Sequence, residues 1–295
     1  CLDRIKYIMD KIGKFEEAGF DRVATKAPLH DIKNIYGILP MDRAKPYDSK
    51  FLIQHLVDNS EFEEYKEAYG KTILCGYARI DGWAVGIVAN NRMTTKNKKG
   101  EMQFGGVIYN DSADKAARFI MNCNQKKIPL VFLQDVTGFM VGSRSEHAGI
   151  IKDGAKMVNA MSNSTVPKFT IILGNSYGAG NYAMCGKAYD PRLIYAWPSA
   201  RIAVMGGEQA AKVMLQIEKA SLEAKGEKIT PESEKELLDK IIARYEKQLS
   251  PYYAASRIWV DGIIDPIETR KVISEGIAMA NHAPVKPFNV GVLQT

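Results

Sequence analysis

The hydrophobic pattern of the chain changes at Thr72, where short apolar runs rich in β-branched residues begin. Residues 73–80 and 83–89 each have the length and composition of a strand, and Asp81-Gly82 between them is typical of a tight hairpin turn. Further apolar runs of strand length follow at residues 129–134, 167–173, 193–197 and 202–204. The pattern therefore predicts a β-hairpin followed by a series of buried strands.

Helical periodicity lies between these strands. Residues 112–124 place Ala113, Ala116 and Ile120 on one face, and residues 148–163 have the length of another helix. Strands that alternate with helices through short links are typical of a mostly parallel sheet covered by helices, which is an α/β fold. Ligands bind in such folds where strands end and helices begin, so we expect the functional residues there.

The N-terminal part does not follow this alternation. Residues 4–17 have helical apolar spacing and are followed by polar, proline-bearing sequence up to Pro46. We therefore interpret residues 1–46 as an N-terminal arm or linker and residues 47–295 as the folded domain.

Residues 211–249 are charge-rich and helical, with Gly226 as a break and Thr230-Pro231 as a helix start. We expect a helical hairpin that covers the core, and its exposed half is a candidate oligomer contact. The second helix carries an apolar stripe formed by Leu237, Leu238, Ile241, Ile242, Tyr245 and Leu249.

Composition narrows the function classes. The net charge is +6, but Lys and Arg are interspersed with acidic residues, and the densest basic run, at residues 96–99, adjoins Gly100 as in a solvated loop, which does not favour nucleic-acid binding. The four cysteines and four histidines are scattered without metal-ligand spacing, so we expect no metal site and a reducing compartment.

No apolar stretch reaches the roughly 20 residues that span a bilayer, so we expect no membrane partner. The chain opens on Cys1 rather than Met, which indicates that its native start, with any targeting peptide, is missing.

Two glycine-rich loops end consecutive predicted strands, at residues 138–142 and 177–180. In a parallel sheet these loops would lie side by side. Small residues at Gly178, Ala179 and Gly180 let a ligand approach the backbone, and the first amides of a following helix have no intrahelical partner. The pattern fits an oxyanion hole, although glycine turns that only permit tight packing would look the same.

Nucleotide motifs are incomplete here. Residues 178–183 satisfy G-x-G-x-x-A, but the acidic residue expected about 20 positions later for a ribose is replaced by the stretch Trp197-Pro-Ser-Ala-Arg. Gly186-Lys187 lacks the following Ser or Thr of a P-loop, since Ala188 stands there. Neither a dinucleotide nor an ATP site is favoured.

Several strings together carry a family resemblance, which extends from about Tyr36 to the C-terminus. The chain resembles the carboxyltransferase β subunits of biotin-dependent acyl-CoA carboxylases, above all the methylcrotonyl-CoA carboxylase type. The strings include Gly138-Phe-Met-Val-Gly, Gly149-Ile-Ile-Lys-Asp-Gly-Ala-Lys, Tyr177-Gly-Ala-Gly-Asn-Tyr, Trp197-Pro-Ser-Ala-Arg, Val204-Met-Gly-Gly-Glu-Gln-Ala and Ser250-Pro-Tyr-Tyr-Ala-Ala-Ser-Arg.

The resemblance implies two crotonase-type domains in tandem in the whole subunit, an acyl-CoA-binding domain followed by a carboxybiotin-binding domain. This chain is similar to the second, so we expect a crotonase-like (ClpP/crotonase) ββα superhelix that is inactive without the CoA-binding N-terminal domain. The resemblance also implies a homo-oligomer, in the cytoplasm or, in a eukaryote, the mitochondrial matrix. The Met-Lys-Met of a biotin carrier is absent, which implies that a biotin carboxylase/biotin carrier subunit delivers the cofactor as carboxybiotin.

The resemblance also assigns roles to residues. The amides of Ala179 and Gly180 would bind the biotin urea oxygen, and Tyr182 would select the acyl substrate, although it could equally be a core tyrosine. The residues implied to line the biotin cleft are Gly138, Phe139, Met140, Val141, Gly142, Gly178, Gly206 and Gly207.

The chemistry at these positions favours carboxyl transfer over hydration. Crotonase-type hydratases carry glutamates where this chain has Asn181 and Gly206 or Gly207, and none of these side chains is a base. A carboxyltransferase needs no carboxylate there, because its cofactor supplies the base and the protein supplies positioning and oxyanion holes. Two alternatives stay open, which are a biotin-dependent sodium-pumping acyl-CoA decarboxylase and a non-catalytic assembly module.

Overall fold

The Asp81-Gly82 turn joins two antiparallel strands, as predicted, with Ile80 opposite Trp83. The computed structural model describes residues 1–14, 16–43, 45–224 and 230–289. Its main sheet has the order β1-β2-β3-β7-β9-β10-β12, and β11 also pairs with β9. The strands are β1 (Glu63–Glu64), β2 (Ile73–Ile80), β3 (Trp83–Asn90), β7 (Leu130–Val136), β9 (Lys168–Tyr177), β10 (Leu193–Ala196), β11 (Arg201–Ala203) and β12 (Gly262–Ile263).

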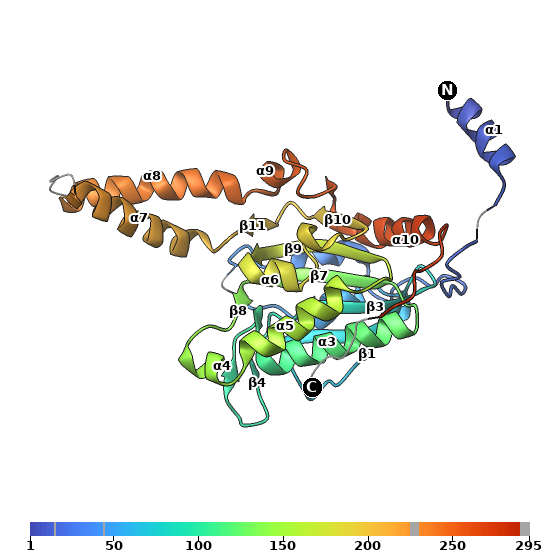
Figure 1. The fold of residues 1–295 in the computed structure, drawn as a ribbon, viewed down its shortest axis with the longest axis horizontal. Coiled ribbons are helices and arrows are strands. Elements are labelled where there is room, and N and C mark those ends of the chain that lie inside the picture. The colour runs from blue at the N-terminus through green and yellow to red at the C-terminus, as the bar shows by residue number, and fades with distance from the viewer. Residues whose placement is uncertain (15, 44, 225–229, 290–295) are drawn as a thin grey trace.

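From β3 to β12 the neighbouring strands are parallel, which confirms the expected α/β arrangement. The side chains of β7 show why this sheet needs cover on both faces. Val131 and Leu133 enter one apolar cluster, together with residues of α10 (Thr269–Ala280). Leu130 and Phe132 enter the other cluster, under α3 (Asn110–Gln125) and α5 (Ile150–Ser162), which lie side by side in Figure 1.

The remaining elements are short or peripheral. They are α1 (Leu2–Ile12), η1 (Ile32–Gly37), α2 (Ser49–Gln54), η2 (Asp58–Ser60), β4 (Thr95–Lys96), β5 (Met102–Gln103), β6 (Val107–Ile108), β8 (Gly138–Phe139), α4 (Ser143–His147), α6 (Gly178–Ala183), η3 (Lys187–Tyr189), α7 (Gly207–Ala224), α8 (Pro231–Leu249), α9 (Pro251–Ala255) and η4 (Pro266–Glu268).

The N-terminal segment divides into two parts. The helix α1 stands away from the sheet in Figure 1 and buries no residue. Farther along, Phe20 and Ile35 are buried in the same cluster as α10, so this part of residues 1–46 packs onto the domain. The buried Asp58 carboxylate holds it there, since it accepts hydrogen bonds from the amides of Lys26 and Gly82, at 3.1 and 2.9 Å.

The predicted helical hairpin is present as α7 and α8, but the expectation that it covers the core is wrong, since the two helices extend together away from the sheet in Figure 1 and bury a small apolar cluster of their own. Thr230 caps α8 by accepting a hydrogen bond from the Ser233 amide, and Pro231 occupies its first turn. The expected break at Gly226 lies outside the described residues. Ile241 is buried against Leu215 of α7.

Three of the four cysteines are buried, and all are free thiols. Burial raises the pKa of Cys75 to about 12 and that of Cys185 to about 11, and it raises the pKa of Cys123 as well. These thiols therefore behave as small apolar side chains at neutral pH. Within the described residues, no helix combines the length and apolar character needed to cross a bilayer.

Candidate active site

The loops that follow β7 and β9 meet at one edge of the sheet. The two strands are parallel, with Val136 opposite Ser176, so their carboxyl ends emerge together. A Cβ atom built on Gly180 would lie 3.1 Å from the Gly138 Cα atom and 2.6 Å from Val136 Cγ2. The structure therefore places the two glycine-rich loops in direct contact, as the sequence pattern predicts.

Backbone hydrogen bonds fix the first of these loops. Gly138–Phe139 form β8, which pairs in parallel with β6. The Thr137 amide donates to the Gly106 carbonyl, and the Met140 amide donates to the Ile108 carbonyl, both at 2.8 Å. Gly142 precedes α4 with φ +110°, a conformation that favours glycine. This loop is thus held in a defined shape.

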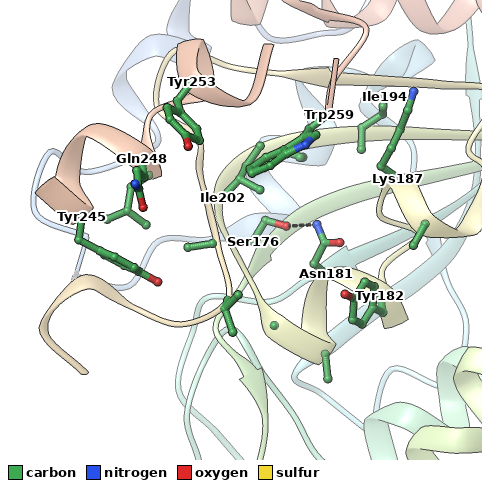
Figure 2. A pocket seen from close by; sticks show the side chains of 17 residues that line it. Ser176, Asn181, Tyr182, Lys187, Ile194, Ile202, Tyr245, Gln248, Tyr253 and Trp259 are labelled. Atoms are coloured by element: carbon green, nitrogen blue, oxygen red, sulfur yellow. Dashed lines mark hydrogen bonds between the residues drawn. The ribbon is translucent and has the colours of Figure 1, made fainter. Parts of the chain in front are cut away.

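The second loop turns directly from β9 into α6. Gly178 has φ +50°, and a Cβ atom there would lie 2.8 Å from the Val204 carbonyl oxygen. Beneath the turn, Asn181 Nδ2 donates to Ser176 Oγ at 2.6 Å (Figure 2). Ser176 Oγ in turn donates to Gln134 Oε1, also at 2.6 Å. The Asn181 amide is therefore part of the support of α6, and the first amides of α6 have no acceptor within the helix.

An apolar hollow of about 420 Å³ opens on one side of α6, which we call the Phe139 hollow. Residues of the first loop form one wall, and α5 and α6 form the others. It is lined by Phe139, Met140, Val141, Glu146, Ile150, Ile151, Gly154, Ala155, Val158, Ala179, Tyr182 and Tyr189. The close approach of α5 depends on Gly154, whose Cβ atom would lie 2.9 Å from the Phe139 ring.

A second hollow of about 540 Å³ lies on the other side of α6, and we call it the Trp259 hollow. Figure 2 shows Tyr245 and Gln248 of α8, Tyr253 of α9 and Trp259 facing the strands and α6 across it. Its walls are mainly apolar, and Lys187 at its margin pairs with Asp261 at 3.1 Å.

Ala179 and Tyr182 line both hollows. The Tyr182 side chain is 48% exposed, and its ring meets the Tyr189 ring edge-on at 5.9 Å. The interpretation of Tyr182 as a core tyrosine is therefore wrong, since it stands at the surface between the two cavities.

Gly206 and Gly207 lie apart from the Phe139 hollow. A Cβ atom on Gly206 would be 3.7 Å from the Tyr177 ring, and one on Gly207 would be 3.2 Å from Glu246 Oε1 of α8. The two glycines thus let α7 start close to α8 and β9, and neither lines the two hollows. Their contact with biotin stays a prediction.

Sequence reasoning missed the role of a buried acid beneath the site. Asp135, near the end of β7, accepts hydrogen bonds from the Asn175 amide at 2.8 Å and the Tyr47 hydroxyl at 3.1 Å, and it pairs with Arg92 at 3.4 Å. Burial and the Asp135 charge hold the pKa of Tyr47 well above its usual range. The sequence feature that could have revealed this role is a carboxylate at the end of an apolar strand, directly before the first glycine loop.

Comparison with known proteins connects this geometry to a family. The sequence model of the family described as the carboxyl transferase domain matches residues 2–290 of this chain. The mitochondrial methylcrotonoyl-CoA carboxylase beta chain of Arabidopsis thaliana is 47% identical over 276 residues, which are 94% of this chain and 45% of that protein. The chain thus spans about half the length of such relatives.

Solved structures support the same family assignment. The geranyl-CoA carboxylase beta subunit of P. aeruginosa superposes with a TM-score of 0.79 and 34% identity, over 99% of this chain and 52% of that one. The transcarboxylase 12S structure, described as a hexamer assembly with hydrolysed methylmalonyl-coenzyme A bound, gives a TM-score of 0.78 and 35% identity, over 95% and 51%. The shared fold is the crotonase-like α/β fold that the resemblance implied. The match along nearly the whole sequence and the common fold lead to one conclusion, that the chain belongs to the carboxyl transferase domain family.

Proposed function

We propose that the chain is the carboxybiotin-binding half of a biotin-dependent acyl-CoA carboxyltransferase. The observation that carries this proposal is the contact of the two glycine loops beside the Phe139 hollow, at the start of α6. Loop amides without intrahelical partners, an apolar wall and a small-residue turn are what a neutral ring with one polar oxygen requires.

The sequence-predicted residues other than Gly206 and Gly207 each have a role in this proposal. The amides of Ala179 and Gly180 donate to the urea oxygen of biotin, and the ring lies against Phe139, Met140 and Val141. Gly138, Gly142 and Gly178 give the loops their shape. The hollow of about 420 Å³ has room for a small bicyclic ring, so the residues fit the cofactor.

Catalysis in this proposal rests on position and polarity. Carboxybiotin, when bound, supplies the carboxyl group and the base. The protein holds it beside the acyl α-carbon and keeps water out with apolar walls, and two donated hydrogen bonds favour negative charge on the urea oxygen. Asn181 takes no part in proton transfer, since its amide supports Ser176.

The partners follow from the same proposal. A biotin carboxylase/biotin carrier subunit brings the cofactor, and a CoA-binding carboxyltransferase domain brings the acyl-CoA. A homo-oligomer is expected, because the transcarboxylase 12S relative is described as a hexamer. The mitochondrial matrix is the expected compartment if the source is a eukaryote, in keeping with the Arabidopsis relative, which is described as mitochondrial. The decarboxylase alternative is not favoured, since the relatives described above are carboxylase subunits and a transcarboxylase.

The test measures the reverse transfer, from a carboxylated acyl-CoA to free biotin, which requires no biotin-carrying subunit. The chain completed with a CoA-binding domain is expected to show biotin-dependent turnover, and the chain alone is expected to show none. Activity of the chain alone would contradict the division of labour. A completed protein that binds its partners but transfers no carboxyl group would be an assembly module.

Tyr182 is expected to limit the choice of acyl-CoA, because its exposed ring separates the two hollows on either side of α6. Changing Tyr182→Asp in the completed protein should shift the ratio of kcat/KM for methylcrotonyl-CoA and propionyl-CoA. Contacts of this size discriminate by about 1–3 kcal/mol, which is about 5- to 150-fold. The matched control is Tyr252→Asp, an exposed tyrosine of α9 that lines neither hollow. An unchanged ratio with both activities retained would remove Tyr182 from substrate selection.

A further inference from the structure

A polar cavity of about 690 Å³ lies at the opposite end of the strands from the glycine loops. It is formed where the segments that lead into β9 and β10 meet the residues that follow α10. The strand β9 runs from Lys168 in this cavity to Tyr177 beside α6, a span of about 30 Å at the usual rise per residue. The cavity therefore opens at the other end of β9 from the glycine loops, and it shares only Ala188 with the Trp259 hollow and Tyr189 with the Phe139 hollow.

A buried cation without a counter-ion lines this cavity. Lys168 is 6% exposed, and its ammonium donates to the Met161 carbonyl at 3.2 Å. Within the described part of the chain, no carboxylate lies within ion-pair distance of this ammonium. Burying an ammonium is costly unless its remaining donors find a charged or polar partner, so the site favours an anion beside Lys168.

The other lining residues of the cavity also favour an anion. Arg192 and Lys286 are exposed cations in its lining, and Asp190 is the one carboxylate among the described lining residues. The hydroxyl oxygen of Thr165, another lining residue, is buried and has no hydrogen-bond partner. The lining thus contains three cations, one carboxylate and one hydroxyl without a partner. The cations and the hydroxyl can donate hydrogen bonds to an oxyanion.

We propose that this cavity, the Lys168 pocket, binds the oxyanion group of a small ligand, either a carboxylate or a phosphate. Lys168 contacts the anion in the interior, the Thr165 hydroxyl donates to it, and Arg192 and Lys286 attract it at the mouth. The volume is that of a small-molecule site and leaves room for a ligand body beyond the anionic group.

The test uses inorganic phosphate and succinate as separate probes of the full chain, in equilibrium dialysis and thermal unfolding. We expect saturable binding of at least one probe near one equivalent per chain, with a rise in Tm that tracks saturation. The probe that binds more tightly identifies the anion class. If neither probe binds, or if binding does not saturate, the proposal is overturned.

Variants separate a binding role of Lys168 from a structural one. Lys168→Met keeps the aliphatic stem, and it should weaken anion binding at least about tenfold while leaving the Tm of the anion-free protein unchanged or higher. The exposed double variant Arg192→Ala/Lys286→Ala should weaken binding several-fold without loss of folding. Lys99→Met, in the remote β4–β5 loop, is the matched control and should leave binding unchanged.

Two results would overturn the proposal at this stage. One is that the control variant weakens binding as much as Lys168→Met does. The other is that Lys168→Met lowers the Tm of the anion-free protein while the double variant binds the probe as tightly as the original chain.

Discussion

Replacing Gly180 with valine in the completed protein is expected to lower carboxyl transfer at least about 100-fold. A single Cβ atom at this position would already lie 2.6 Å from Val136 Cγ2 and 3.1 Å from the Gly138 Cα atom. The branched side chain therefore pushes the two glycine loops apart and displaces an amide donor. Loss of one oxyanion donor alone lowers turnover by about 100- to 1,000-fold. The measurement is kcat for transfer to free biotin, with the Tm recorded in parallel.

A companion variant separates the loss of the site from a loss of folding. Ala179→Phe places a ring at an exposed position that lines both hollows, where no loop must move to admit it. It should lower transfer as strongly as Gly180→Val with little change in Tm. The control is Gly37→Val, where a Cβ atom meets nothing within 4 Å. Normal turnover of folded Ala179→Phe protein would place the reaction elsewhere.

Replacing Gly174 with alanine is expected to cost about 3 kcal/mol of the free energy of unfolding. The new Cβ atom would lie 2.5–2.6 Å from the carboxyl carbon and oxygens of Asp135. That carboxylate is buried and accepts from Tyr47 and the Asn175 amide, so moving it leaves buried polar groups unpaired.

Urea unfolding of the Gly174→Ala variant gives the measurement. Gly37→Ala is the matched control and should change stability by less than about 0.5 kcal/mol, because the position is open and exposed. Equal stabilities of the two variants would show that Asp135 can move without penalty, and its network would then not support the candidate site.

The regular elements could be predicted from the sequence because their periodicity is local. The predicted strands at residues 129–134 and 193–197 agree with β7 and β10 within two residues. The strand predicted at 167–173 continues to Tyr177, because β11 pairs with residues 175–177. The small and polar residues of that extension resemble a loop, and pairing with β7 on one side and β11 on the other makes them a strand.

Burial of isolated apolar residues could not be predicted. Phe20 stands in a polar segment without periodicity, and its burial depends on residues far along the chain. Its amide donates to Asn281 Oδ1 at 3.0 Å, across 261 positions of sequence. Periodicity carries no information on such a contact, so a packed segment resembled a linker.

One feature of the candidate site could also be predicted from the sequence, and another could not. Contact between the two glycine loops followed from the parallel sheet, since parallel strands end at one edge. The position of Tyr182 between two cavities did not follow, because the far wall of the Trp259 hollow comes from Tyr245, Tyr253 and Trp259, at least 63 residues later in the sequence.

The projecting α7–α8 hairpin has the geometry of a lever. Its 19-residue second helix is about 28 Å long, so a rotation of about ten degrees at its base displaces the far end by about 5 Å. Tyr245, Gln248 and Leu249 lie at the base of this helix, where they line the Trp259 hollow. Because α8 is one continuous helix, a partner bound at the far end of the hairpin would be connected through that helix to the wall of the Trp259 hollow, at the side of α6 that carries Tyr182.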